Sequence, residues 1–113
     1  MISSDVLRGY NDTIVLSCLI EKDSYGYEIS KTITQKSNGS YLMKETTLYS
    51  VFSRLEKNGY INAYEGEETL GSKRRYYAIT ESGVLYYLDK CLEWEETQKL
   101  ITLFIRRENN GKD

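Results

Sequence analysis

Residues 45–80 switch from a helical period to a strand period, and this switch constrains the fold more than any other feature of the chain. Four apolar residues recur at the spacing of one helix face: Leu48, Val51, Phe52 and Leu55. Asn58-Gly59 then ends the helix, because glycine accepts the left-handed conformation that closes many helices. Residues 61–64 and 75–79 alternate as strands do, on either side of an acidic turn region at 65–71. The pattern predicts a helix followed by a two-stranded ribbon.

The opposite face of this helix has no apolar side chain to bury. It carries hydroxyls near its start and cations further on: Thr46, Thr47, Ser50, Arg54 and Lys57. We expect Thr46 or Thr47 to cap the helix, and the N–H groups of its first turn to suit a phosphate. The same residue types also make an ordinary solvated face, and the helix alone does not decide between the two interpretations.

Three consecutive cations, Lys73, Arg74 and Arg75, are expected at the tip of the ribbon. The chain as a whole is acidic, with a formal net charge of -2 and a pI near 5.3. That balance argues against indiscriminate nucleic-acid binding, so any DNA contact must come from local charge. A cluster of this kind contacts phosphate readily, and it shifts the interpretation of the preceding helix towards DNA binding.

The N-terminal half predicts two more helices. The first covers residues 5–20 and begins near Ser4, and the second opens at Asp23-Ser24 and ends at residues 37–40. Residues 41–43 are expected to form a short strand that pairs with the ribbon. The order helix, helix, helix, ribbon is that of a winged helix-turn-helix, an α+β fold that is mostly α.

A long final helix is predicted from Glu81, capped by Thr80, to about Arg107. At 1.5 Å per residue it spans roughly 40 Å, more than so small a chain can cover by itself. Its apolar residues form a near-heptad seam and a flank: Val84, Leu88, Cys91, Ile101 and Ile105, with Leu85, Leu92, Leu100 and Phe104. We therefore expect a homodimer, with a DNA-binding domain at residues 1–80 and a dimerisation helix and tail at 81–113.

Trp94 is the one tryptophan of the chain and lies within this seam, beside Glu93, Glu95 and Glu96. An aromatic plane near carboxylates suits a flat cationic molecule. The alternative is that Trp94 fills the dimer core while the glutamates face water. Residue types alone leave both interpretations open.

Catalysis finds little support in the sequence. The chain has no histidine, so it lacks the commonest general base and the commonest transition-metal ligand. CxxC, GxxxxGK and GxGxxG patterns are also missing from it. We expect neither an enzyme nor a site for a cofactor or metal.

A chain of 113 residues supports one modest core. The apolar run at residues 13–20 is too short to span a bilayer, and the first residues lack a secretory pattern, so we expect a cytoplasmic protein without a membrane partner. Cys18 and Cys91 lie on apolar helical stripes and are expected to be reduced and buried, with a redox role for Cys91 as the alternative.

Three segments of the chain resemble the PadR family of bacterial winged-helix regulators: YGYEI at 25–29, TTLYSVFSRLEKNGYI at 46–61 and SKRRYYAITESG at 72–83. They occur in the family's order and spacing, and the resemblance covers nearly the whole chain. The single long helix after the ribbon is similar to the compact subfamily that includes the lactococcal multidrug-resistance regulator. One departure is Ser50, where many members have a proline.

The resemblance implies a ligand site between two subunits. In the compact subfamily a tryptophan of the last helix stacks planar drugs, and Trp94 stands at the corresponding place. The first helix lines the same pore, which implicates Val6, Tyr10 and Thr13 by position.

Residues and resemblance together predict a homodimeric regulator, a repressor that binds a double-stranded operator near its own gene or a transporter gene. Tyr49, Ser50 and Arg54 would enter the major groove, and Thr46 and Thr47 would place the helix end on phosphate. The wing cations would grip the adjacent backbone, and a planar small molecule would bind at the dimer interface. The alternative is a winged-helix module that binds another protein through its ribbon.

Overall fold

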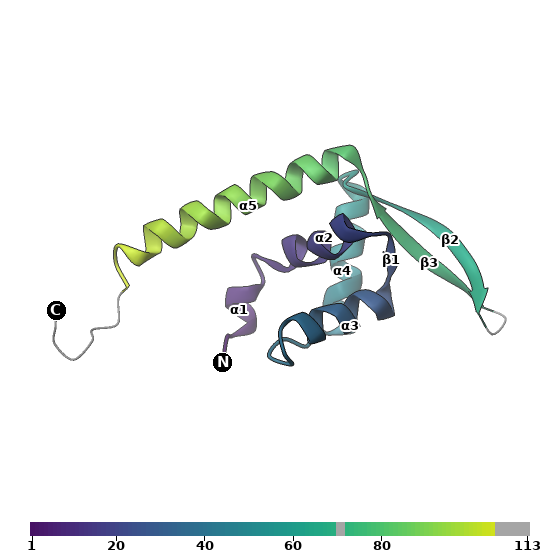
Figure 1. Ribbon diagram of the computed structural model, residues 1–113, viewed down its shortest axis with the longest axis horizontal. Helices are drawn as coiled ribbons and strands as arrows, with labels where there is room; N and C mark the ends of the chain where they lie inside the picture. The colour runs from purple at the N-terminus through teal and green to yellow at the C-terminus, as the bar shows by residue number, and fades with distance from the viewer. Residues whose placement is uncertain (70–71, 106–113) are drawn as a thin grey trace.

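The computed structural model describes residues 1–69 and 72–105. Its elements follow one another as α1 (Ser4–Leu7), α2 (Asn11–Glu21), β1 (Ser24–Tyr25), α3 (Gly26–Lys36), α4 (Glu45–Lys57), β2 (Ile61–Thr69), β3 (Ser72–Ile79) and α5 (Glu81–Thr102). The strands form one antiparallel sheet in the order β1-β3-β2. The long β2–β3 ribbon, called the wing below, and α5 extend from the helical body in opposite directions (Figure 1). The mostly helical α+β winged fold predicted from the sequence is confirmed.

The core lies where α2, α3 and α4 meet the base of the sheet. Its most deeply buried side chains come from all four: Val15, Leu16, Leu19, Ile29, Val51, Phe52, Leu55 and Ile61. The Phe52 ring stacks on Tyr77 with centroids 3.9 Å apart, which joins α4 to β3. Leu48 is also buried, so the predicted apolar face of α4 is confirmed in full.

Helix α4 ends as expected but does not begin as expected. Gly59 has a φ of 77°, and the N–H of Tyr60 donates to the Leu55 carbonyl at 2.9 Å, as in a Schellman cap. At the start, Lys44 is the N-cap and makes no side-chain capping bond. The predicted cap by Thr46 or Thr47 is wrong, because the helix already begins at Glu45, whose negative charge suits the first turn.

The wing is longer than predicted. β2 continues to Thr69, so the acidic residues expected in a turn lie in the strand, with a bulge between Glu65 and Glu68. Glu65 lies opposite Arg75 in the β2–β3 register. Unlike charges at opposite positions stabilise the pairing of two strands, so residues that the sequence pattern assigned to a turn continue the strand instead. Lys73, Arg74 and Arg75 consequently lie along β3 rather than at the tip, and the expected turn residue Gly71 is outside the described residues.

The first predicted helix is two helices in the structure. α1 ends at Leu7 and α2 begins at Asn11, because Gly9 between them has low helix propensity. The α1 cap is Ser3, whose hydroxyl accepts the Val6 N–H at 3.3 Å, and not Ser4.

The short first strand also differs from the prediction. Residues 24–25 pair with β3, whereas residues 41–43 form no strand. The Tyr41 N–H donates to the Ser37 hydroxyl at 3.0 Å, so a local side chain takes the place of a strand partner. Ser24, expected as a cap of the second helix, is buried in β1, and its hydroxyl donates to Glu28 at 2.5 Å. That bond lowers the pKa of Glu28.

Helix α5 is anchored at its start and uncovered along most of its length. The Thr80 hydroxyl accepts the Gly83 N–H at 3.0 Å, as predicted, and Tyr86 stacks on Tyr60 at 4.2 Å. The helix has 22 residues and spans roughly 33 Å. It ends at Thr102 rather than near residue 107. The N–H groups of Leu103 and Phe104 donate to carbonyls three residues earlier and tighten the last turn, and residues 106–113 lie outside the description.

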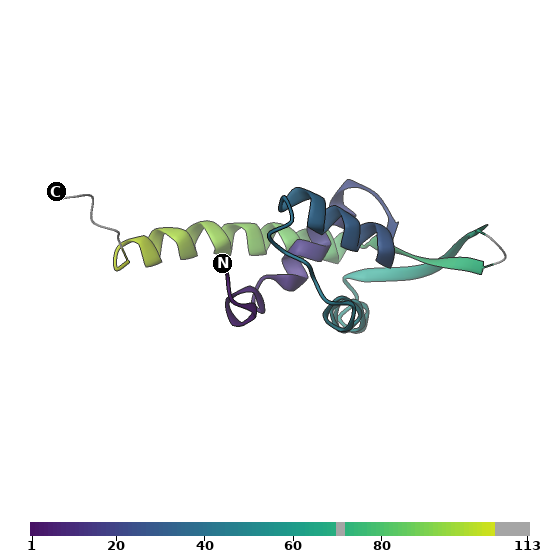
Figure 2. The same ribbon diagram turned by 90° about the horizontal axis from the view of Figure 1, so that it is seen from below.

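The C-terminal half of α5 projects beyond α2 (Figure 2). From Leu88 to the end of the described chain, the exposed large apolar residues are Leu88, Leu92, Trp94, Leu100 and Ile101 of α5, and Leu103, Phe104 and Ile105 after it. Val84 and Cys91 of the predicted seam are half-buried. Within residues 1–69 and 72–105, none of the helices combines the length and the apolar character needed to cross a bilayer.

Gly83→Ala should lower the free energy of unfolding by about 1–3 kcal/mol, because a Cβ there would overlap the Tyr60 carbonyl oxygen and crowd Ile79. Urea unfolding followed by circular dichroism measures the change. Gly9→Ala is the matched control, since a Cβ at Gly9 meets open space. Equal stability of the two variants would contradict the close approach of α5 to residue 60.

Candidate nucleic-acid interface

One face of α4 is open to solvent along the whole helix. Its exposed side chains are Thr46, Tyr49, Ser50, Ser53, Arg54 and Lys57, and Thr47 beside them is half-buried. The first-turn N–H groups have no side-chain cap, so they remain available to an anion. The face therefore offers hydroxyl groups, cations and a helix N-terminus on one surface.

Tyr49 is held more firmly than an exposed residue usually is. Its ring meets Phe52 edge-on at 5.6 Å, and its hydroxyl lies so close to Gly26 that a Cβ there would stand 2.9 Å away. About half of the side chain remains exposed, at 48%. Tyr49 thus wedges α4 against α3 and still presents an outer edge.

Arg54 has a partner that the sequence did not indicate. Its Nε donates to the Asp12 carboxylate at 3.2 Å, and its Nη2 donates to the second oxygen of the same carboxylate. This bidentate bond raises the pKa of Arg54. The side chain lies on the open face, as predicted, but it is tied back to α2.

The wing cations are also engaged. Lys73 lies 3.4 Å from the Glu65 carboxylate, and Arg75 lies 3.2 Å from Glu56 of α4. Arg74 stacks its guanidinium over the Tyr25 ring, 4.4 Å from the centroid. These pairs are exposed and therefore weak, so a phosphate can replace the carboxylate.

Two lysines on this side complete the positive surface. Lys44 stands at the N-cap of α4 and Lys57 in its last turn, and in the described part of the chain neither is ion-paired. Sequence reasoning placed Lys57 on the face and missed Lys44. The signal for Lys44 was its position directly before a helix that begins at Glu45.

A set of stacked tyrosines fixes the wing to the body. Tyr76 packs on Tyr25 at 5.3 Å and on Tyr64 at 5.7 Å, and the Tyr64 hydroxyl donates to Asp23 at 2.6 Å. This bond raises the pKa of Tyr64. These tyrosines set the direction of the wing relative to α4. The periodicity of the sequence did not indicate that they pack together.

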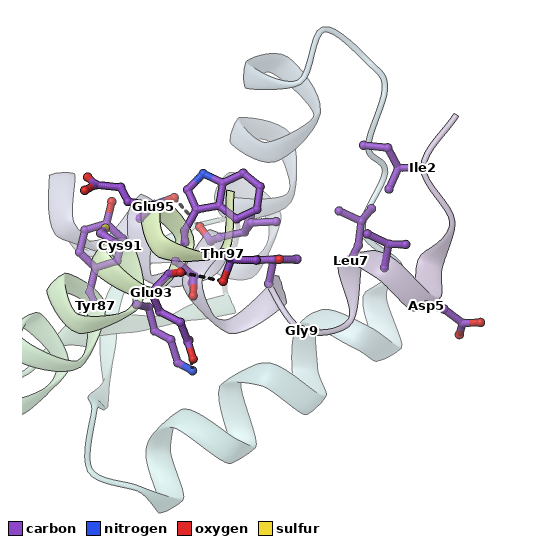
Figure 3. Close-up of a pocket in the computed structure, with 16 residues that line it drawn as sticks. Ile2, Asp5, Leu7, Gly9, Tyr87, Cys91, Glu93, Glu95 and Thr97 are labelled. Atoms are coloured by element: carbon purple, nitrogen blue, oxygen red, sulfur yellow. Dashed lines mark hydrogen bonds and ion pairs between the residues drawn. The ribbon is translucent and has the colours of Figure 1, made fainter. Parts of the chain in front are cut away.

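A groove of about 1080 Å³ lies between the N-terminal segment, α2 and α5. Figure 3 shows Ile2 and Leu7 on one side of it and Cys91 and Glu93 of α5 on the other. All four residues implicated by the resemblance line it: Val6, Tyr10, Thr13 and Trp94. The structure thus brings together residues that are far apart in the sequence.

Aromatic rings and carboxylates give this groove its character. Tyr10 meets Trp94 at 5.2 Å in a T-shaped contact, and Trp94 is 45% exposed. Asp5, Glu93 and Glu95 add acidic groups, of which Glu93 pairs with Lys90 at 2.9 Å. Such a groove suits a flat molecule with positive charge.

The two cysteines differ in their surroundings. Cys18 is buried, as predicted, and burial raises the pKa of its thiol, which keeps it protonated and unreactive. Cys91 is only half-buried and lines the groove, so the prediction of a buried thiol is wrong for this residue. The reason is that α2 covers only one side of α5 near Cys91, so the thiol stays partly open to the groove.

Comparisons with known proteins place these features in a family. The transcriptional regulator PadR-like family matches residues 15–87, which include α3, α4 and the wing. A transcriptional regulator from Clostridium thermocellum is 62% identical, with a TM-score of 0.87, over 94% of this chain and 100% of that one. A PadR family transcription regulator from Clostridium difficile is 32% identical, with a TM-score of 0.72, over 84% and 97%. A protein from Lysinibacillus sphaericus without an assigned function is 48% identical over 93% of this chain and 96% of its own length.

Asn11→Ala should lower the free energy of unfolding more than Asp12→Asn does. The first leaves the half-buried Tyr41 hydroxyl without its acceptor, at a cost of about 1–3 kcal/mol. The second removes a partly exposed ion pair with Arg54, worth about 0.2–1 kcal/mol and less at high salt. Urea titrations at two salt concentrations test this order, with the exposed pair of Asp5 as a control through Asp5→Asn. The reverse order would show that the Asn11 contact is not formed.

Proposed function

Because the chain belongs to the PadR-like family of transcriptional regulators, we propose that this DNA-binding regulator works as a dimeric repressor in the cytoplasm. Its operator would be a palindrome near its own gene or a transporter gene. Members of the family are regulators and not enzymes. The observation that carries the proposal is the presence, in one small chain, of an open polar face on α4 and an uncovered apolar face on α5.

The open face of α4 would enter the major groove. Tyr49 and Ser50 project from its first half, where recognition helices contact base edges. Thr46 and Thr47 with the free N–H groups would hold a phosphate, and Lys44 would lie beside it. The wing would follow the neighbouring backbone, where Lys73, Arg74 and Arg75 exchange their present partners for phosphate oxygens.

The second copy of the chain would cover α5. Leu88, Leu92, Leu100 and Ile101 are each about half or more exposed, and each contributes about 1.5–3 kcal/mol when fully buried. A two-fold symmetric dimer formed through this helix would place two α4 helices on half-sites about one DNA turn apart.

The groove beside Trp94 would bind a planar, cationic effector. Trp94 and Tyr10 offer aromatic rings, and Glu95, which in the described chain pairs with no cation, offers negative charge. The volume of about 1080 Å³ is in the range of sites for drug-sized molecules. Val6 and Thr13 would belong to the same site, because both line the groove.

Binding to DNA should depend steeply on salt. If each subunit neutralises about four phosphates, log affinity should fall against log salt with a slope of roughly -7 for the dimer. A duplex selected from a random-sequence pool and titrated by fluorescence anisotropy gives this slope. Lys44→Ala should reduce its magnitude by about 2, since two subunits each lose one contact. Lys99→Ala, on α5, is the matched control and should leave it unchanged.

A slope near zero, or failure to select any duplex, would contradict the DNA-binding proposal. If, in that case, a protein were found to bind through the wing, the alternative of a protein-interaction module would be supported.

Planar cationic compounds should quench the fluorescence of Trp94, which is the only tryptophan. Glu95→Gln should weaken binding of a cationic quencher about fivefold, because one carboxylate that lines the groove loses its charge. Glu96→Gln is the control, since Glu96 is exposed and does not line the groove. Absence of quenching across a broad panel would leave Trp94 as part of the dimer core.

A further inference from the structure

The first turn of α2 touches both the groove and the DNA-facing helix. Three consecutive residues make three different contacts: Tyr10 with Trp94, Asn11 with Tyr41, and Asp12 with Arg54. We call residues 10–12 the coupling turn. Nothing in the sequence pattern indicated that one helical turn would reach so many separate elements.

The Asn11 contact holds the segment that leads into α4. Asn11 is 8% exposed, and its side-chain oxygen accepts the Tyr41 hydroxyl at 2.6 Å. Burial raises the pKa of Tyr41, so the hydroxyl remains a donor at neutral pH. Tyr41 belongs to the segment that leads to Lys44, the N-cap of α4, and Met43 of that segment is buried in the core. Movement of Asn11 would therefore shift the start of α4.

The Asp12 contact controls a side chain on the open face. The Asp12 carboxylate holds the Arg54 guanidinium with two hydrogen bonds, while the Arg54 side chain remains 50% exposed. A phosphate that approaches the open face competes with Asp12 for the same donors. DNA binding would then release Asp12. Asp12 lies two residues after Tyr10 in the same helical turn.

The Tyr10 contact brings the same turn to the groove. Tyr10 is the N-cap of α2, and its ring meets Trp94 at 5.2 Å. Since the three residues share one helical turn, a rotation that separates Tyr10 from Trp94 also displaces Asn11 and Asp12. A molecule that wedges between the two rings would produce that rotation.

We propose that the coupling turn links occupancy of the groove to DNA binding, with Asp12 as the positioning residue that holds Arg54 in the unbound arrangement. The inference rests on the proposed function and names its regulation. Because such linkage is reciprocal, DNA must affect the groove as much as a groove ligand affects DNA binding. The coupling is therefore testable without an identified effector.

Trp94 supplies the readout. The 113-residue chain is titrated with a duplex selected from a random-sequence pool, and Trp94 emission is followed together with DNA anisotropy. We expect the emission intensity or wavelength to change in step with DNA binding. A duplex that binds and leaves Trp94 emission unchanged would overturn the inference.

Asp12→Asn separates coupling from mere proximity of DNA. The variant keeps the side-chain shape and frees Arg54, so it should bind the duplex at least as tightly as wild type while losing more than half of the Trp94 response. Glu21→Gln is the matched control, because it neutralises an exposed carboxylate of the same helix that neither lines the groove nor holds Arg54, and it should keep the full response. A full response in Asp12→Asn would contradict the role of Asp12. If the anisotropy shows that the wild-type chain binds no duplex, the proposed function itself fails, and the inference fails with it.

Discussion

The apolar surface that α5 carries beyond the helical body is the constraint on which the arrangement depends. The core between α2, α4 and the sheet is complete without the second half of α5, so residues such as Leu92 and Leu100 find no cover within the described chain. So many large apolar side chains left exposed on one helix indicate an interface. We propose that a second copy covers it. This pairing would fix the distance between two α4 helices and close the groove beside Trp94, so that DNA recognition and a response to a small molecule would depend on the same contact.

Three cations of the open α4 face and the wing are already paired with carboxylates. Arg54, Lys73 and Arg75 each hold a carboxylate, and each would have to give up that partner to bind a phosphate. Replacing a carboxylate by a badly placed phosphate would contribute little to the free energy of binding an ill-fitting duplex. We propose that a well-placed phosphate backbone would replace several carboxylates at once, so that this arrangement would favour selectivity over general attraction. The tyrosines packed around Tyr76 fix the direction of the wing relative to the helical body, on which such a fit would depend.

Local signals in the sequence predicted much of the fold. The buried face of α4, its stop at Gly59 and the cap at Thr80 depend on residues within one or two turns of each other. The strand at residues 24–25 escaped prediction because it is too short to show a period and exists only through its pairing with β3. The same limit applied to the site. Helical spacing put Arg54 on the correct face, but its partner Asp12 lies 42 residues earlier and can be found only in three dimensions.

The mass of the protein in dilute solution tests the proposed dimer most directly. Sedimentation equilibrium should give about 26 kDa, twice the chain mass of 13.2 kDa, at low micromolar concentration. Leu92→Glu should reduce the mass to that of one chain, because it places a charge on the apolar face of α5. Tyr27→Glu changes an exposed ring on α3 to the same acid and should leave the dimer intact. A wild-type mass of 13.2 kDa under these conditions would contradict the account.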